Sequence, residues 1–215
     1  MSNRVFWGTL LAVEIGIVVV GGIVVGAGGH AAWYASRAAG FAAYFSLWIA
    51  LAGGLLMSSA WFDGIVARAR LLAIHQTAGL VGLGFAAGHA LVLLLDSYIG
   101  YSVVDLLVPF AASHERTLTG LGVVTLYLTA LVTLSFWVRT AIGMRVWRMV
   151  HYLSVVAFLG AAWHGMQMGT SADFGWGRAV YLITTLSLVT ATVVRAVYVR
   201  PTRRTAKAAG GVSAG

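Results

Sequence analysis

Six long apolar runs alternate with short polar or charged breaks along the chain. The runs cover residues 5–27, 40–60, 71–95, 118–138, 149–169 and 177–199. Each run has the length of about 20 residues that an α-helix needs to cross the hydrocarbon layer of a membrane. None of them alternates apolar and polar residues as a membrane strand does. The pattern predicts an all-α integral membrane protein, in which residues 1–200 form a six-transmembrane-helix bundle.

The segments outside the bundle are short. Residues 201–215 are basic at first and then rich in Ala, Gly and Ser, which predicts a disordered tail. The longest connection is 96–117, and residues 103–110 within it have the composition of a short interfacial helix. Residues 1–36 also resemble a cleaved signal peptide, but their apolar run is long for one and contains Glu14. We therefore expect a retained first helix.

The distribution of basic residues predicts the orientation of the bundle. Eleven of the 14 Lys and Arg residues lie in the N-terminus, the second-to-third loop, the fourth-to-fifth loop and the C-terminal end. Because basic loops stay on the cytoplasmic side, we expect both termini in the cytoplasm of a multi-pass membrane protein. The net charge of +8 is explained by this placement and not by a nucleic-acid partner.

Composition excludes several classes of site. The chain is 60% hydrophobic and only 9% charged, and it contains no cysteine. Disulfides, iron–sulfur clusters and thiolate-bound metals are therefore excluded. Six spans leave no room for a nucleotide- or flavin-binding domain, so any FAD or FMN must belong to a separate partner.

Four histidines lie inside the predicted spans, where an ionisable residue is costly and points to function. His75 and His89 are on the third span, and His151 and His164 are on the fifth, which runs in the same direction. His75 and His151 are near the starts of their spans. His89 and His164 follow 14 and 13 residues later, about 20 Å deeper along a helix. Matched depth predicts two pairs, His75 with His151 and His89 with His164.

The angular positions of these histidines around their helices agree less well with this pairing. A spacing of 14 residues keeps His75 and His89 on one helix face, whereas 13 residues turn His151 and His164 about 140° apart on a straight helix. Bending of the fifth span near Gly160, or cofactors set at different angles, would allow both pairs to form.

Two imidazoles at one depth suit heme better than zinc. Zinc requires three or four ligands that converge, whereas a heme iron takes two axial nitrogens, and small residues let its flat ring approach. Gly79, Gly82, Gly84 and Gly88 surround the third-span histidines, and Gly160 and Gly165 flank His164, although close helix packing alone also favours small residues. We expect two bis-histidine heme b groups that carry single electrons.

These residues resemble the ferric reductase-like transmembrane domain of ferric reductases and NADPH oxidases. The matching stretches, within residues 40–200, are Arg70 to Gln76, His89, Arg145 to Tyr152, and His164-Gly165. The resemblance implies electron passage from a cytoplasmic donor through an inner and an outer heme to an extracytoplasmic acceptor. That acceptor would be a ferric chelate, oxygen or a reductase protein.

This chain departs from the larger members of that family because it lacks their FAD- and NADPH-binding domain. It is closer in size to heme-binding membrane subunits of bacterial periplasmic reductases, such as the methionine sulfoxide reductase system, which implies a bacterial plasma membrane. Some of those subunits lack the inner histidine, which is present here as His75. The resemblance thus implies that this chain is a component of an oxidoreductase, to which a separate cytoplasmic flavoprotein or a quinol would supply the electrons.

Several other residues are candidates for the same site. Arg68, Arg70, Arg145 and Arg148 cluster at the level of His75 and His151, where they would hold heme propionates or act as positive-inside anchors. Arg37, Arg178 and His30 are weaker candidates for the other heme. Phe158, midway between the histidines of its span, would bridge the hemes or simply pack. His114 is expected in solvent, and we assign no role to Glu14.

Two alternatives remain open from the sequence. One is a quinol-linked cytochrome b that anchors a larger oxidoreductase. The other is a heme-free membrane transporter or scaffold whose histidines are structural or bind protons.

Overall fold

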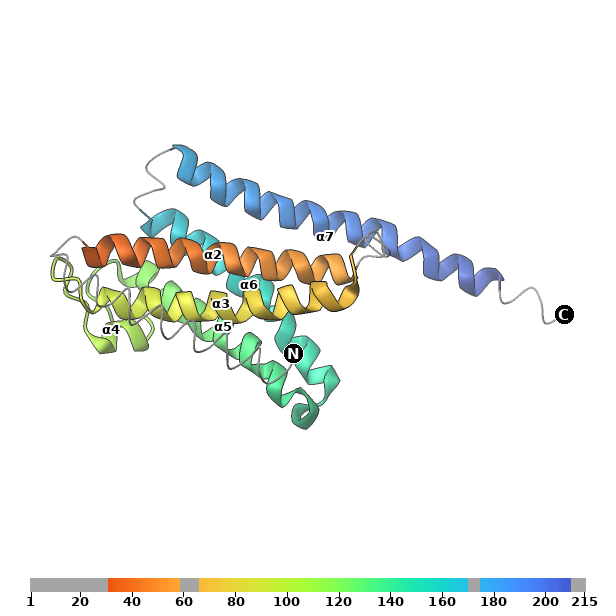
Figure 1. Ribbon diagram of the computed structural model, residues 1–215, viewed down its shortest axis with the longest axis horizontal. Helices are drawn as coiled ribbons and strands as arrows, with labels where there is room; N and C mark the ends of the chain where they lie inside the picture. Colours follow the sequence, from red (N-terminus) through yellow and green to blue (C-terminus); the bar gives the residue numbers. More distant parts are fainter. Residues whose placement is uncertain (1–30, 59–65, 170–174, 210–215) are drawn as a thin grey trace.

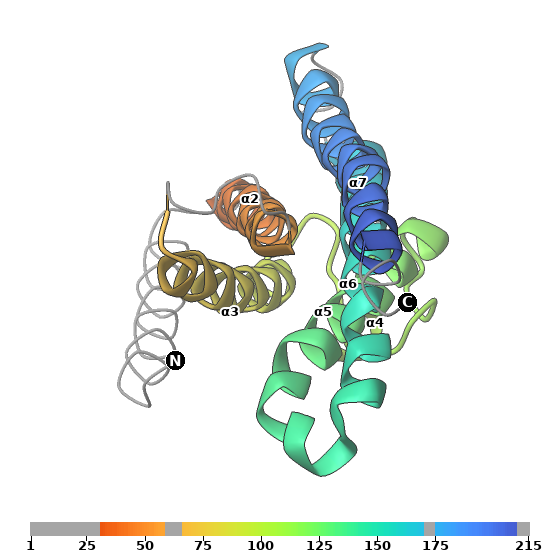
Figure 2. The same ribbon diagram turned by 90° about the vertical axis from the view of Figure 1, so that its right-hand side faces the viewer.

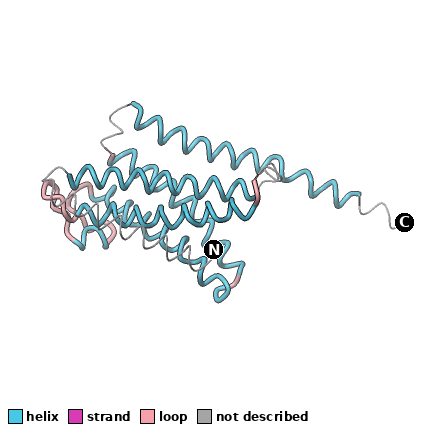
Figure 3. Tube along the Cα trace, in the orientation of Figure 1, coloured by secondary structure: helices cyan, strands magenta, loops and turns pink. Residues whose placement is uncertain are grey.

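The fold is all-helical in the part of the chain that the structure describes (Figures 1 and 3). The structure is a computed structural model and describes residues 31–58, 66–169 and 175–209. It has six helices there: α2 (Ala31–Ser58), α3 (Arg68–Leu93), α4 (Val103–Leu107), α5 (Arg116–Ile142), α6 (Met144–Met168) and α7 (Gly175–Ala209). The first predicted span, 5–27, and the residues Glu14 and His30 lie outside the described residues.

Five of these helices are long and apolar enough to cross a membrane: α2, α3, α5, α6 and the Gly175–Val197 part of α7. They correspond to the second to sixth predicted spans. Many of their large apolar side chains face outward, such as Ile183, which is 65% exposed. In a bilayer such side chains contact lipid and not water. The chain is therefore a multi-pass integral membrane protein.

Helix boundaries differ from the apolar runs where polar residues continue a helix. α2 begins nine residues before the predicted run, and Arg37 lies over the Trp33 ring one turn earlier, 4.3 Å from its centroid. α5 and α6 are separated only by Gly143, whose positive φ of 81° turns the chain. Glycine adopts this backbone conformation without steric cost.

α7 continues past residue 200, where the sequence predicts that the disordered tail begins, to Ala209, and residues 210–215 lie outside the described part. Residues 201–209 begin with Pro201, which disfavours a helix interior, and then contain Ala, Arg and Lys, which favour helix. Extending an existing helix requires no new nucleation, so these residues follow the preceding span.

The long helices form two pairs, which Figure 2 shows from one end. α2 packs along α3, and α5 packs along α6, whereas contacts between the two pairs are far fewer. α7 lies against α2 and α6. A buried cluster joins these last three helices and contains Tyr44, Leu47, Phe158, Ala162, Tyr181 and Leu188. The two pairs therefore meet through side chains around a central region, not along a continuous helix interface.

The connection between α3 and α5 is ordered by local hydrogen bonds. Ser102 Oγ accepts from the Asp105 backbone N–H, and the Asp105 carboxylate accepts from the Ser102 N–H, which makes a capping box for α4. These Ser102 bonds hold the pKa of Asp105 below its usual value. The short helix is the one predicted within 103–110, although it ends at Leu107.

We expect Tyr44→Phe to destabilise the bundle by about 1 kcal/mol. Tyr44 is 3% exposed, and its hydroxyl lies 2.5 Å from Thr184 Oγ1, so the bond joins α2 to α7 inside the protein. The free energy of unfolding in mixed micelles measures the change. Ser187→Ala is the control, because it removes the exposed bond from Trp48 Nε1 between the same helices. An equal loss in both variants would contradict the role of burial.

Candidate functional site

The four histidines meet in two pairs across the gap between α3 and α6. The ring centroids of His75 and His151 are 5.8 Å apart, with 71° between the ring planes. Those of His89 and His164 are 6.3 Å apart, with 79° between the planes. These are the pairs that matched depth predicts from the sequence. Each pair takes one ring from each half of the bundle.

The 13-residue spacing on α6 does not prevent this pairing, because the two α6 histidines leave their helix in different directions. His164 reaches α5, where its Nδ1 lies 2.9 Å from the Leu118 backbone oxygen. His151 stacks on Trp147 of its own helix, with ring centroids 5.0 Å apart and planes 23° apart. α6 itself is one helix from Met144 to Met168, without a break at Gly160.

Backbone carbonyls of neighbouring helices fix three of the four rings. The Nδ1 atoms of His75, His89 and His164 lie 2.6, 2.8 and 2.9 Å from the carbonyl oxygens of Ala50, Ser36 and Leu118. A carbonyl only accepts, so Nδ1 must donate its hydrogen to it. The neutral ring then has its lone pair on Nε2. The Nε2 atom of each of these rings is therefore the one available to accept a hydrogen bond or to bind a metal.

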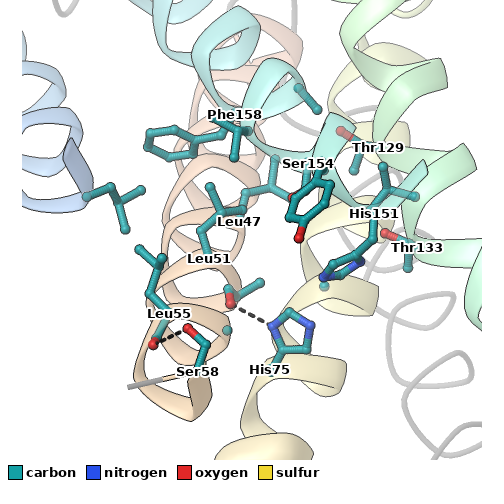
Figure 4. Close-up of a pocket in the computed structure, with 18 of the residues that line it drawn as sticks. Leu47, Leu51, Leu55, Ser58, His75, Thr129, Thr133, His151, Ser154 and Phe158 are labelled. Atoms are coloured by element: carbon teal, nitrogen blue, oxygen red, sulfur yellow. Dashed lines mark hydrogen bonds between the residues drawn. The ribbon is translucent and has the colours of Figure 1, made fainter. Parts of the chain in front are cut away.

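A cavity of about 680 Å³ surrounds His75 and His151, and we call it the His75 cavity. Figure 4 shows both rings among the residues that line it, together with Leu47, Leu51 and Leu55 of α2. Its remaining lining is mostly apolar, with a few hydroxyl groups such as that of Thr133. Trp147 Nε1, which is buried and has no hydrogen-bond partner among the described residues, also lies here. The cavity offers an apolar slot with polar groups at isolated points.

A second cavity, the His89 cavity, has a volume of about 220 Å³ and surrounds His89 and His164. Leu47 and Thr129 line both cavities, so a single layer of side chains separates them. Phe158 of the His75 cavity stacks on Tyr44 of the His89 cavity, with ring centroids 5.2 Å apart. The aromatic contact therefore connects the two sites at mid-depth.

The arginines predicted to accompany the His75 pair are not among the residues that line its cavity. Arg70, Arg145 and Arg148 do not line either cavity, and Arg148 Nε donates to the Met144 carbonyl of its own helix at 3.3 Å. The arginine at the His75 cavity is Arg195 of α7, which sequence reasoning treated only as a basic residue of the C-terminal end. Its position inside the predicted span 177–199, where a charged residue is costly, is the sequence signal that could have identified it as a functional residue. Arg37, which the sequence offered as a weaker candidate for the second heme, lines the His89 cavity.

The α3–α5 connection closes one side of the His89 cavity through Tyr101. The Tyr101 hydroxyl lies 3.2 Å from Thr119 Oγ1, and its ring packs against His114, with centroids 6.1 Å apart. Burial raises the pKa of Tyr101, and the negative charges of Asp105, Glu115 and Asp96 add to the increase, while the bond to Thr119 opposes it. The phenol is therefore neutral at physiological pH.

Comparison with known proteins finds no matching family model, no matching curated protein and no matching solved structure. The ferric reductase-like resemblance therefore rests on the quoted residues alone.

We expect Phe158→Ala to destabilise the protein by about 3 kcal/mol, because it removes a ring that is 2% exposed and leaves a void beside the His75 cavity. The free energy of unfolding in mixed micelles measures the loss. Phe45→Ala is the control, since Phe45 is 39% exposed and faces outward from α2. A loss at Phe158 no larger than that at Phe45 would show that the Phe158–Tyr44 contact does not hold the bundle together.

Proposed function

We propose that this protein is a di-heme b-type cytochrome that transfers electrons across the membrane. His75 and His151 would ligate one heme and His89 and His164 the other. With both termini in the cytoplasm, as the basic residues predict, the His75 heme lies on the inner side. The donor would be a separate flavoprotein or a quinol, and the acceptor would be extracytoplasmic.

The distance between paired rings carries this proposal. A metal–imidazole bond is about 2.0–2.1 Å long, and the ring centre lies about 1.1 Å beyond the nitrogen, so two imidazoles that bind one metal ion from opposite sides would have centres about 6.3 Å apart. The observed separations are 5.8 and 6.3 Å. The His89–His164 separation matches this value and the His75–His151 separation is somewhat shorter, so the spacing supports the first pair most directly.

The donor set also favours heme over zinc. No group of three or more His, Cys, Asp or Glu residues is placed to hold a metal ion in the described part of the chain. Zinc requires such a group. Both rings of the His89–His164 pair, and His75 of the other pair, have Nδ1 bonded to a carbonyl and Nε2 available, which suits the axial ligands of a heme iron. When bound, two such hemes supply single-electron transfer between the membrane faces.

The cavities support the two sites unequally. The His75 cavity, at about 680 Å³, lies within the range of about 300–1,000 Å³ that is typical of cofactor sites, and the His89 cavity, at about 220 Å³, lies below it. A macrocycle at His89 therefore requires its lining side chains to move apart. The separation of 6.3 Å between the rings already allows iron between them.

Other residues of this chain would orient the cofactors and keep water away from them. Arg195 at the His75 cavity and Arg37 at the His89 cavity would each bind a propionate, because guanidinium donates two parallel bonds to a carboxylate. The unpartnered Trp147 Nε1 supplies one more donor. The Phe158–Tyr44 stack would pack between the two macrocycles.

We expect His75→Ala and His151→Ala each to remove the same heme, while the second heme stays bound and reducible. His89→Ala and His164→Ala should remove the other. Absorption spectra of the dithionite-reduced protein and a redox titration count the hemes in each variant. His114→Ala is the control, because His114 lies in the α3–α5 connection and lines neither cavity.

Two results would contradict the proposal. Wild-type protein without a reducible b-type absorption would favour a heme-free transporter or scaffold. Heme loss that paired His75 with His164 would show that the ligand pairs are wrong.

A further inference from the structure

Each of the three carbonyl-bonded histidines rests against a glycine of the same neighbouring helix. His89 bonds to the carbonyl of Ser36, and its ring lies against Gly40. His75 bonds to the carbonyl of Ala50 and lies against Gly54. His164 bonds to the carbonyl of Leu118 and lies against Gly122. In all three cases the glycine follows the carbonyl residue by four positions.

Helix geometry explains the spacing of four. In an α-helix the carbonyl of residue i points toward the N–H of residue i+4. The Cβ of residue i+4 tilts back toward the helix N-terminus, over the same carbonyl. An imidazole that approaches this carbonyl from the side therefore meets that Cβ. Glycine, which has no Cβ, leaves the approach open.

The contacts that an added Cβ would make differ among the three glycines. At Gly122 it would lie 2.8 Å from His164 Cε1, closer than real Cβ atoms approach. At Gly40 it would lie 3.2 Å from His89 Nδ1, a tight contact. At Gly54 it would lie 3.4 Å from His75 Cε1, an ordinary van der Waals contact. The need for glycine thus decreases from Gly122 to Gly40 to Gly54.

α2 supplies two of these carbonyl–glycine pairs at the same spacing as the histidines that they hold. Ser36 and Ala50 are 14 residues apart, and so are Gly40 and Gly54, which matches the separation of His75 and His89 on α3. Two helices packed side by side keep such a register along their length (Figure 1). The repetition indicates that the carbonyl–glycine pairs serve to orient the histidines and are not chance packing contacts.

We propose that Gly40, Gly54 and Gly122 are positioning residues for the heme ligands. Each one lets a histidine ring reach a helix carbonyl, which fixes the ring plane and directs Nε2 away from that helix. The inference rests on the proposed heme function. It assigns the orientation of three ligands to α2 and α5, two helices that carry no ligand of their own.

Alanine variants test the proposal through the spectroscopic signals of each heme. In Gly122→Ala we expect loss of the His89–His164 heme, or a shifted midpoint potential and shifted low-spin electron paramagnetic resonance g values for it. In Gly40→Ala the same heme should be retained with a smaller shift. Gly54→Ala should change only the His75–His151 heme, and least of the three. Electron paramagnetic resonance is informative because g values depend on the planes of the axial imidazoles, which general loss of stability does not rotate.

Gly82→Ala is the matched control. A Cβ at Gly82 would lie 3.1 Å from Leu47 Cδ2, so it crowds the same α2–α3 interface as Gly40→Ala but touches no histidine. Leu47 lines both cavities, so this variant disturbs the heme surroundings without touching an imidazole, and we expect the g values of both hemes to stay those of the wild type.

Three outcomes would overturn the proposal. They are unchanged signals of the His89–His164 heme in Gly40→Ala, a change in Gly82→Ala as large as that in Gly40→Ala, and a larger effect for Gly54→Ala than for Gly40→Ala. If Gly122→Ala does not accumulate in the membrane, the comparison of Gly40→Ala, Gly54→Ala and Gly82→Ala still tests whether these glycines position the ligands. Wild-type protein without heme would instead overturn the proposed function itself.

Discussion

The hydrogen bond from an imidazole Nδ1 to a helix carbonyl is the interaction on which this structure depends. A polar ring inside a membrane is costly unless its hydrogen-bonding groups are satisfied. His75, His89 and His164 meet this requirement at one nitrogen through Ala50, Ser36 and Leu118. The second nitrogen of each ring is then available as the metal ligand that the proposed function requires. One hydrogen bond would thus both lower the cost of burying the ring and orient it as a ligand.

That constraint also explains why the bundle is divided into two helix pairs. α2 holds the rings of the α3 histidines and α5 holds the ring of His164, so each half of the bundle fixes histidine rings that it carries itself. The halves share few direct contacts, and the two cavities lie where they face each other. Cofactors between them would therefore add packing contacts that the protein alone lacks. Binding of such groups to the folded state stabilises it by mass action.

Much of this architecture could be predicted from the sequence, because membrane spans and buried histidines leave strong local signals. Five described spans and both histidine pairs follow from apolar runs and from spacings of 14 and 13 residues. The partners of the rings could not be predicted, since Gly40, Gly54 and Gly122 resemble the many other small residues of membrane helices. Arg195 was missed because side-chain placement at the cavity depends on how α7 packs. The continuation of α7 through residues 201–209 was not predicted, because Pro201 and the loss of apolar residues there indicate the end of a helix.

The ratio of heme to protein tests the central claim most directly. Heme b and polypeptide can be quantified independently in one purified sample of the full chain, expressed with sufficient heme supply. We expect two hemes b per chain, both low-spin and six-coordinate, because each histidine pair would provide both axial ligands. One heme per chain would contradict the assignment of a ligand role to both pairs. No heme would contradict the electron-transfer function as a whole.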